Sequence, residues 1–328
     1  MDIGVACGVR QVAHSVARYE SILINDACRG ILQAAVSSMV EKMRAIEQVD
    51  VFCVGTCGGS PAPVVLNADS MTPDEMREVA AEFGHEAGFV MQPTDKAKAD
   101  LQYRFFVPLA EMDMCGHGTL GTTWLLAKKG RLKPGEVRIE TKSGIVLGRI
   151  SDTGAVAISQ PAATIAVIDA RYRAGIIKVL GLTERDLLDL PLLNATTSRT
   201  KTLIPLASPV VLNDLKPDFD ALKALCESIG STGLYPFACD LEDERTYHAR
   251  QFPAASGYPE DAATGTAATA LLYGLKHWGL IGLRRTIRVR QGDAMGRPSR
   301  MAVTLADHAN TTAGCWLSGE VRLSDRAA

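Results

Sequence analysis

The sequence predicts an α+β fold of two related, pseudo-symmetric halves, each mostly β-strand around one apolar α-helix, after an N-terminal helical extension. Three observations support this prediction. The chain has 328 residues, which suits about two domains. Short apolar segments separated by turn residues dominate from residue 49 onward, as is typical of β-rich proteins. The order of helix, turn and strands in the first half returns in the second half, which indicates an internal repeat.

The composition argues against several classes of protein. Lys and Arg total 35 and Asp and Glu total 37, so a net charge of −2 offers no basic surface to a nucleic-acid backbone. Aromatic residues make up 5%, too few to suggest a base-stacking surface. No apolar run approaches the roughly 18 residues of a membrane-spanning helix, and the N-terminus shows no signal segment. We therefore expect a cytoplasmic protein with no nucleic-acid or membrane partner.

The cysteines indicate free thiols. The chain has eight of them, but they form no CxxC pair and no Cys/His cluster with zinc spacing. In a cytoplasmic protein such cysteines are expected to be reduced. We therefore expect no metal site.

Residues 1–48 are predicted to form the helical extension. From Tyr19 to Ile46 the apolar residues recur at helical spacing, with a break near Gly30. This apolar face must be covered by the body of the protein or by a second chain, and a homodimer would supply the latter. Alternatively, translation begins at Met43, just before the first predicted strand.

The first half is predicted to span residues 49–165. One helix, Thr72–Phe83, has Thr72 as its N-cap, a proline next and acidic residues in its first turn. A second helix, His117–Lys129, ends at Gly130. The predicted strands are Val49–Val54, Pro63–Leu66, Gly88–Met91, Leu101–Val107, Val137–Thr141, Ile145–Ile150 and Ala155–Ser159.

The second half is predicted to span residues 166–323. Helices are predicted at Asp218–Ser228 and Thr266–Trp278, the latter ended by Gly279. The segment 316–323 is predicted as one strand, which is also a candidate to join the first half. The other predicted strands are Leu203–Pro205, Val210–Leu212, Leu234–Ala238, Thr246–Phe252, Thr286–Gln291 and Arg300–Leu305.

The repeat centres on two long apolar helices. Gly118-Thr119 begins the first and Gly265-Thr266 begins the second, and each helix is followed by a strand, a turn and another strand. Helices that are apolar on most sides are buried. Each is therefore expected to fill the inside of a curled sheet.

Two segments lead into these helices and combine small residues with titratable ones. They are Cys115-Gly116-His117-Gly118-Thr119 and Glu260-Asp261-Ala262-Ala263-Thr264-Gly265-Thr266. Small residues at a helix start leave backbone N–H groups open to an anion, so two such starts facing each other would bind a carboxylate. His117, expected to be kept neutral by the helix dipole, and Asp261 would add acid/base chemistry beside it.

A dinucleotide-binding turn is a remote alternative. Residues 116–121 match G-x-G-x-x-G and lead into a helix. The preceding residues 109–114 are too polar for a buried parallel strand, and Pro108 interrupts them. The two halves also do not alternate strand with helix, which disfavours a nicotinamide-dependent dehydrogenase.

Several motifs occur in order over about residues 49–323. They are Val49-Asp50-Val51-Phe52, Gly59-Ser60-Pro61, His85-Glu86-Ala87-Gly88-Phe89, Phe106-Val107-Pro108, Cys115-Gly116-His117-Gly118-Thr119-Leu120-Gly121, Arg250-Gln251-Phe252, Glu260-Asp261 through Gly265-Thr266, and Gln291-Gly292 with Gly296-Arg297-Pro298-Ser299. This set resembles the phenazine-biosynthesis PhzF-like isomerase family. Each motif alone is weak, and their combination is specific.

The resemblance implies a diaminopimelate-epimerase-like fold: two pseudo-symmetric β-rolls, each around a central α-helix, with the active site between them. It also implies a homodimeric, cofactor-independent isomerase that shifts a proton and a double bond in a small carboxylate-bearing substrate. The family's catalytic residues match Glu86, His117 and Asp261. The expected substrate-binding residues are Gly116, Gly118, Thr119, Gly265 and Thr266, the last of which stands where the family has serine.

Three positions depart from the family pattern. His85 precedes the glutamate where the family usually has serine, Ser60 replaces an asparagine, and Ala262 replaces a proline. These positions are expected to line the pocket, with His85 and Ser60 as further candidate site residues. The phenazine substrate is therefore not assigned.

Two other functions remain as alternatives. Racemases and epimerases of this fold use one thiol at each helix start, and Cys115 matches the first. The second start has no cysteine, which disfavours a racemase or epimerase of a small amino or imino acid and favours a packing role for Cys115. A non-catalytic protein that binds small carboxylates is the other alternative, and the intact Glu86, His117 and Asp261 argue against it.

Overall fold

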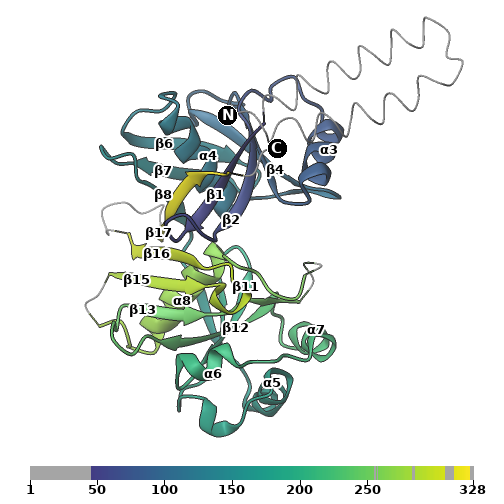
Figure 1. The fold of residues 1–328 in the computed structure, drawn as a ribbon, viewed down its shortest axis with the longest axis vertical. Coiled ribbons are helices and arrows are strands. Elements are labelled where there is room, and N and C mark those ends of the chain that lie inside the picture. The colour runs from purple at the N-terminus through teal and green to yellow at the C-terminus, as the bar shows by residue number, and fades with distance from the viewer. Residues whose placement is uncertain (1–45, 255, 257, 283–284, 307–313, 326–328) are drawn as a thin grey trace, which may run out of the picture.

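The computed structural model describes residues 46–254, 256, 258–282, 285–306 and 314–325. Figure 1 shows two lobes, one above the other, with α4 in the first and α8 in the second. Most of the predicted helical extension lies outside the described residues. Its last three residues belong to strand β1 (Ile46–Cys53), because they pair with residues 63–65 of the next strand. The predicted boundary at residue 48 therefore falls inside a strand.

The first lobe is a curled sheet around α4 (Gly116–Lys128), whose residues are buried on almost every side. Helix α3 (Pro73–Phe83) covers the outside, where its Met76 packs with Phe89 and Phe106. The strands after β1 are β2 (Ser60–Val65), β3 (Ala87–Met91), β4 (Leu101–Val107), β5 (Ala110–Met112), β6 (Gly135–Thr141), β7 (Gly144–Ile150) and β8 (Val156–Gln160). Strand β2 runs parallel to β3 and β4 runs parallel to β6, while the other neighbours are antiparallel.

The second lobe repeats this plan around α8 (Gly265–His277). Helices α5 (Arg173–Leu180), α6 (Pro209–Asn213) and α7 (Phe219–Ser228) form an outer layer with its own apolar core. Its strands are β9 (Thr164–Val167), β10 (Leu193–Thr196), β11 (Thr200–Pro205), β12 (Gly233–Cys239), β13 (Thr246–Ala249), β14 (Phe252–Pro253), β15 (Thr286–Gln291) and β16 (Ser299–Leu305). The predicted α+β class, with a helix inside each of two β-rolls, is confirmed.

The C-terminal strands join the lobes. Strand β17 (Cys315–Ser318) pairs with β16 on one side and with β8 on the other, and β18 (Glu320–Leu323) pairs with β1. The single strand predicted at 316–323 is thus two strands, separated at Gly319. A Cβ at Gly319 would lie 2.5 Å from Phe52 Cδ1 and 2.9 Å from the Arg300 carbonyl oxygen, so the tight junction needs glycine.

Two other predicted strands differ from the structure. Val210–Leu212 lies in helix α6, because the Ser208 hydroxyl accepts a hydrogen bond from the Val211 amide and Pro209 takes the first helical position. The predicted strand Thr246–Phe252 is divided into β13 and β14, since β14 turns to pair with Gly233–Leu234 of β12.

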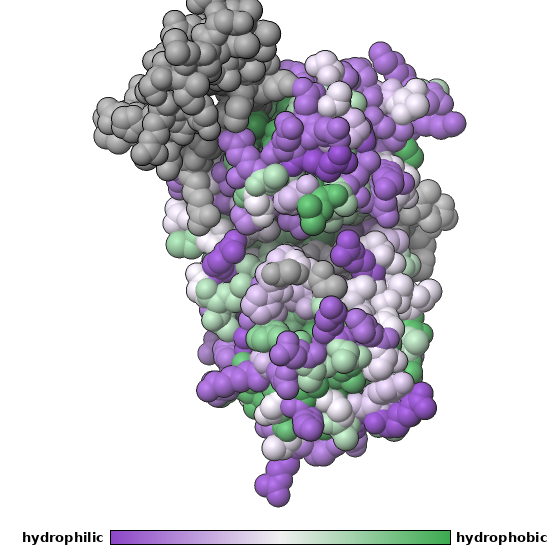
Figure 2. Space-filling view, turned by 90° about the vertical axis from the view of Figure 1, so that its right-hand side faces the viewer, coloured by the Kyte–Doolittle hydropathy of each residue, from purple (hydrophilic) through white to green (hydrophobic). Residues whose placement is uncertain are grey.

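The surface is mainly hydrophilic. The face in Figure 2 carries mainly hydrophilic side chains, with apolar ones in small groups. No helix within the described residues is long and apolar enough to cross a membrane.

Candidate active site

The first helix start lies at the N-terminus of α4. Cys115 is its N-cap, with an extended backbone and no side-chain bond to the helix N–H groups. The Thr119 hydroxyl turns back and donates to the Cys115 carbonyl oxygen at 2.7 Å. The N–H groups of Gly116, His117 and Gly118 belong to the first turn, where no intrahelical acceptor exists. They are available to an anion.

The second helix start, at α8, has the same design. Its N-cap, Thr264, makes no side-chain bond to the helix N–H groups. The Thr264 hydroxyl donates instead to Asp261 Oδ2 at 2.5 Å, and the Ala263 amide donates to Asp261 Oδ1 at 3.3 Å. The Asp261 carboxylate is therefore fixed by its own turn. The N–H groups of Gly265 and Thr266 remain available to a ligand.

Residues of the Gln291–Ser299 motif brace this turn. Gln291 Nε2 donates to the Asp261 carbonyl oxygen at 2.7 Å, and the Tyr235 hydroxyl donates to Gln291 Oε1 at 3.0 Å. The Ser299 hydroxyl donates to the Ala262 carbonyl oxygen at 2.7 Å. This motif thus shapes the second helix start from behind.

A buried ion pair anchors the other end of the turn. The Arg250 guanidinium donates to both Glu260 carboxylate oxygens, at 2.9 and 2.7 Å, and the two side chains are only 10% and 11% exposed. Arg250 Nη1 also donates to the backbone carbonyls of Leu212, Asn213 and Leu215. Such a bidentate, fully paired arrangement fixes the residue that precedes Asp261.

The two helix starts meet at the junction of the lobes. Leu317 of β17 is fully buried, and its Cδ2 lies 3.9 Å from the Cβ position of Gly116 and 2.4 Å from that of Gly265. The ring of Phe52 reaches within 3.7 Å of the Gly265 position. A Cβ at Gly265 would displace the Leu317 side chain, and apolar contacts hold the two helix N-termini close together.

Glu86 of the first lobe interacts electrostatically with groups at this meeting point. It lies between Gly84, the left-handed C-cap of α3, and the start of β3, and it is half-buried. Its carboxylate acts electrostatically on His117, Asp261 and Tyr258. The structure therefore brings the three predicted catalytic residues together, two from the first lobe and one from the second.

The acidic neighbours of His117 change its protonation. Loss of solvation lowers the pKa of His117, but the Cys115 sulfur and the carboxylates of Glu86 and Asp261 raise it more strongly, to about 10. The expectation that the helix dipole keeps His117 neutral is therefore wrong. Burial raises the pKa of Asp261, although bonds from Thr264 and Ala263 oppose the rise. A charged imidazolium thus lies beside a carboxyl that holds its proton more tightly than usual.

Cys115 contributes a single thiol to the site. It is 4% exposed, and its Sγ lies 3.5 Å from His117 Nδ1. The equivalent N-cap position of α8 is Thr264, whose hydroxyl is engaged by Asp261. The described residues therefore place one thiol–imidazole pair at the first helix start and no thiol at the second. They also contain no group of three or more His, Cys, Asp or Glu side chains suited to a metal.

His85, Thr266 and Ser60 are the remaining predicted site residues. His85 is half-buried and directly precedes Glu86, and Thr266 is half-buried in the first turn of α8. Ser60 begins β2 and pairs with Val51. The residue before Ser60, Gly59, donates to the Pro298 carbonyl oxygen at 3.0 Å, so this loop contacts the Gly296–Ser299 segment of the second lobe.

The sequence did not reveal Tyr258. Its side chain is 44% exposed, and burial of the phenol together with the Asp261 and Glu86 carboxylates raises its pKa. Tyr258 lies at the edge of the same charged group. It stands in a loop without a motif, so no residue pattern could have marked it.

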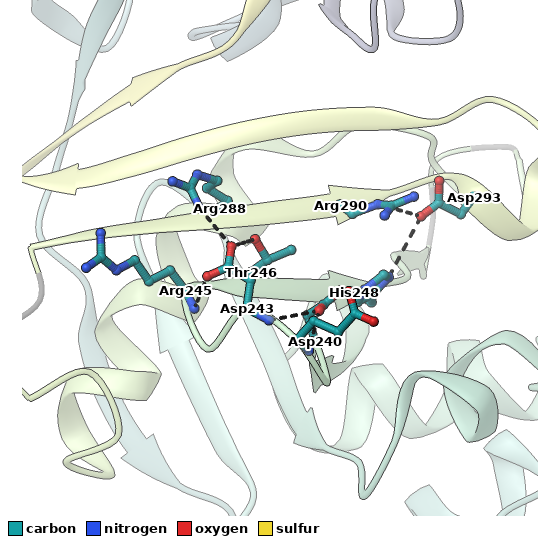
Figure 3. Close-up of polar contacts among 9 residues, drawn as sticks. Asp240, Asp243, Arg245, Thr246, His248, Arg288, Arg290 and Asp293 are labelled. Carbon is teal, nitrogen blue, oxygen red and sulfur yellow. Dashed lines mark hydrogen bonds and ion pairs between the residues drawn. The ribbon is translucent and has the colours of Figure 1, made fainter.

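Two other polar features lie apart from this centre. A cavity of about 600 Å³ is lined by Arg300, Glu320 and neighbours but by none of the predicted catalytic residues. Figure 3 shows a network of polar contacts across β13 and β15, in which His248 Nε2 lies 2.7 Å from Asp240 and Nδ1 lies 3.9 Å from Asp293. These pairs are partly exposed and belong to the surface of the second lobe.

Known proteins share this sequence and this fold. The chain is 30% identical to "Uncharacterized isomerase YddE" of Escherichia coli K12 over 283 residues, which cover 84% of this chain and 94% of the relative. It is 27% identical to "Trans-2,3-dihydro-3-hydroxyanthranilate isomerase" of Pseudomonas chlororaphis over 258 residues, 77% of this chain and 87% of that protein. A crystal structure of a Bacillus anthracis phenazine biosynthesis protein of the PhzF family superposes with a TM-score of 0.73 at 26% identity, covering 85% of this chain and 96% of the other.

These similarities agree with the resemblance read from the motifs and with the expected class of enzyme, an isomerase. The match to the family described as phenazine biosynthesis-like protein covers residues 49–321, almost the whole of both lobes. The chain therefore belongs to the PhzC–PhzF family.

Proposed function

We propose that this protein is an isomerase that moves a proton and a double bond within a small carboxylate-bearing substrate. The observation that carries the proposal is the meeting of Glu86, His117 and Asp261 at two helix N-termini whose N–H groups are uncapped. Helix N-termini bind carboxylates, and the shifted pKa values of His117 and Asp261 are typical of sites of proton transfer.

The geometry supports distinct roles for the three groups. Glu86, which is half-exposed and belongs to the first lobe, would take a proton from an activated carbon of the substrate. The electron pair shifts along the conjugated system, and Glu86 returns the proton to its far end, so that no atom is gained or lost. His117, as an imidazolium, would donate a hydrogen bond to the charge that develops. Asp261 would hold a polar group of the substrate from the second lobe.

The test is proton exchange with solvent. In deuterated water, trans-2,3-dihydro-3-hydroxyanthranilate and a panel of cyclic, unsaturated carboxylates are screened by mass spectrometry for incorporation of deuterium at carbon. Glu86→Gln is expected to abolish the incorporation, because removing a general base typically costs about 10²–10⁴ in rate. Glu82→Gln changes an exposed glutamate of α3 and should be silent. Full activity of Glu86→Gln would refute the assignment of the base.

A second function is favoured by one contact, the 3.5 Å approach of Cys115 Sγ to His117 Nδ1. A thiol activated by an imidazole could remove an α-proton in an epimerase. Inversion of a chiral amino acid in deuterated water, lost in Cys115→Ser, would identify this function. Tight binding of a carboxylate without any exchange at carbon would instead identify a non-catalytic binding protein.

A further inference from the structure

Lys201 is a buried lysine that takes no part in the proposed proton transfer. It is the second residue of β11 and only 5% exposed. Side chains two residues apart on a strand share a face, and Leu203 on that face contacts α8, with its Cδ1 2.2 Å from the Cβ position of Gly274. Lys201 therefore lies on the face of the sheet that α8 covers, below the helix that begins beside Asp261.

Among the described residues, the ammonium group of Lys201 has no counter-ion. Its Nζ makes no hydrogen bond or ion pair with any described residue, and it is not among the enclosed unpaired atoms, so it keeps contact with solvent. The carboxylate of Asp261 acts on it electrostatically without pairing with it. Burial and the nearby Arg199 lower the pKa of Lys201 to about 8. A nearly buried ammonium that contacts only solvent can gain a charge-assisted hydrogen bond from an anionic ligand.

A second unpaired polar group lies next to Lys201. Thr202 of β11 stands opposite Leu234 of β12 in a parallel pair, which puts Lys201 beside Gly233. A Cβ at Gly233 would lie 2.4 Å from Gln251 Nε2, so the Gln251 amide occupies the space that glycine leaves. Neither polar atom of that amide has a partner among the described residues.

The backbone places this pair of groups at the proposed active site. Gln251 forms a bridge with Asp261, and the Asp261 amide donates to the Gln251 carbonyl oxygen at 3.1 Å. Buried polar groups normally have partners. The Gln251 amide is enclosed, whereas Lys201 Nζ keeps contact with solvent, so Lys201 is the unpaired group near Asp261 that a ligand can reach.

We propose that Lys201 binds an anionic group of the substrate, and that the substrate is a small molecule with two anionic ends, a dicarboxylate in the simplest case. One anionic end accepts hydrogen bonds from the N–H groups of the two helix starts, and the other accepts a hydrogen bond from Lys201 Nζ on the second-lobe side. The first half of this statement rests on the proposed function, which places a carboxylate at the helix starts. The second half rests on the lack of a counter-ion for Lys201.

Calorimetric titration with benzoate and with benzene-1,2-, 1,3- and 1,4-dicarboxylate tests the proposal without any need for turnover. The three dicarboxylates cover a range of separations between the charged ends. A charge-assisted hydrogen bond is worth about 1.5–3 kcal/mol, roughly tenfold or more in affinity. At least one dicarboxylate should therefore bind the wild-type protein about tenfold more tightly than benzoate does.

Three variants locate the source of that preference. Lys201→Met keeps the length of the side chain and should remove the preference while leaving benzoate affinity unchanged. Lys201→Arg keeps the cation and should retain most of it. Lys178→Met removes an exposed lysine of α5 and should retain all of it. Thermal unfolding of Lys201→Met verifies that the variant is folded, and Lys201→Gln replaces it if it is not.

The outcomes separate this proposal from the proposed function. Benzoate binding without any preference for a dicarboxylate, or a preference that survives in Lys201→Met, overturns the role of Lys201 and leaves the isomerase proposal intact. Failure of every carboxylate to bind overturns both. Loss of the preference in Lys201→Met but not in Lys178→Met establishes the second anionic contact.

Discussion

His117 is the residue on which the electrostatics of the candidate site converge. Its ring lies close to the Cys115 sulfur and interacts electrostatically with the carboxylates of Glu86 and Asp261. Together these neighbours raise the pKa of His117 by more than the loss of solvation lowers it. Its raised pKa means that the folded state binds a proton that the unfolded state releases more easily. The stabilising contribution of His117 is therefore complete below about pH 6.5 and is lost as the pH rises toward about 10.

This protonation can be tested directly. In Cys115→Ser we expect the pKa of His117 to fall below its wild-type value, because the substitution removes the sulfur that raises it. Titration of the imidazole by NMR measures the shift. Cys226→Ser alters a buried thiol of α7 in the other core and should leave the pKa of His117 unchanged. An unaltered pKa in Cys115→Ser would contradict the attribution to the sulfur.

Some residues of the candidate site can be identified from sequence patterns, and others cannot. His117 and Asp261 are predicted from the residue pattern alone, because they stand among small residues at helix starts. Such residues leave N–H groups open to an anion. Glu86 stands in no such pattern, and only the resemblance to the family marked it. Lys201 could not be found in the sequence, because its position depends on the strand register and on the space left by Gly233.

At the scale of elements, α4 and α8 are built alike: each starts with an uncapped first turn and enters a curled sheet. Such helices must approach their neighbours closely, and glycines make this possible. A Cβ at Gly118 would lie 2.8 Å from the Phe105 ring and 3.1 Å from Cys115 Sγ, whereas one at Gly116 would meet nothing closer than 3.9 Å.

The two glycines should therefore respond differently to alanine. Gly118→Ala is expected to destabilise the fold by about 1–3 kcal/mol, the usual cost of overpacking. Gly116→Ala, two residues earlier, should change the stability by less than about 1 kcal/mol. Urea denaturation measures both. Equal effects of the two substitutions would contradict the packing seen at α4.

The contact between Asp240 and His248 in the second lobe makes stability depend on pH. The His248 side chain and the amides of Glu242 and Asp243 lower the pKa of Asp240 to about 2. The resulting stabilisation is present above about pH 4, the unfolded value, and disappears as the pH falls toward 2. Asp240→Asn should therefore be less stable than wild type at pH 6, and the difference in urea midpoint should vanish near pH 2. A difference that grows on acidification would have the wrong sign.

Elements with local signals were predicted well, and those decided by distant contacts were not. Helix α3 has a capping box, a proline and a left-handed glycine cap, all visible in the sequence. Helix α6 is an exception, because its signal is local too: the apolar run Val210–Leu212 is typical of a strand, but the adjacent Ser208 and Pro209 start a helix there. The separation of β17 from β18 depends on Phe52, which is remote in sequence from Gly319 and adopts a left-handed backbone with φ of 66°.

At the scale of the molecule, the two lobes share one continuous sheet, and the candidate site lies where they join. Strand β17 pairs with both lobes, and its Leu317 packs against both helix starts. Stability and the geometry of the site are thus linked through one side chain. A substitution there should affect both, whereas an equally buried residue in the outer core should affect stability alone.

The comparison of Leu317→Ala with Leu222→Ala tests this link. Both side chains are at most 1% exposed, and each substitution should cost about 2–5 kcal/mol in unfolding free energy. Leu317→Ala should also lower carboxylate affinity and proton exchange, because the starts of α4 and α8 lose the contact that fixes their separation. Leu222 packs in the outer core of the second lobe, so its variant should keep both activities at temperatures where it remains folded. Equal activity of the two variants would show that the lobes hold their spacing without Leu317, and that the sheet alone positions the site.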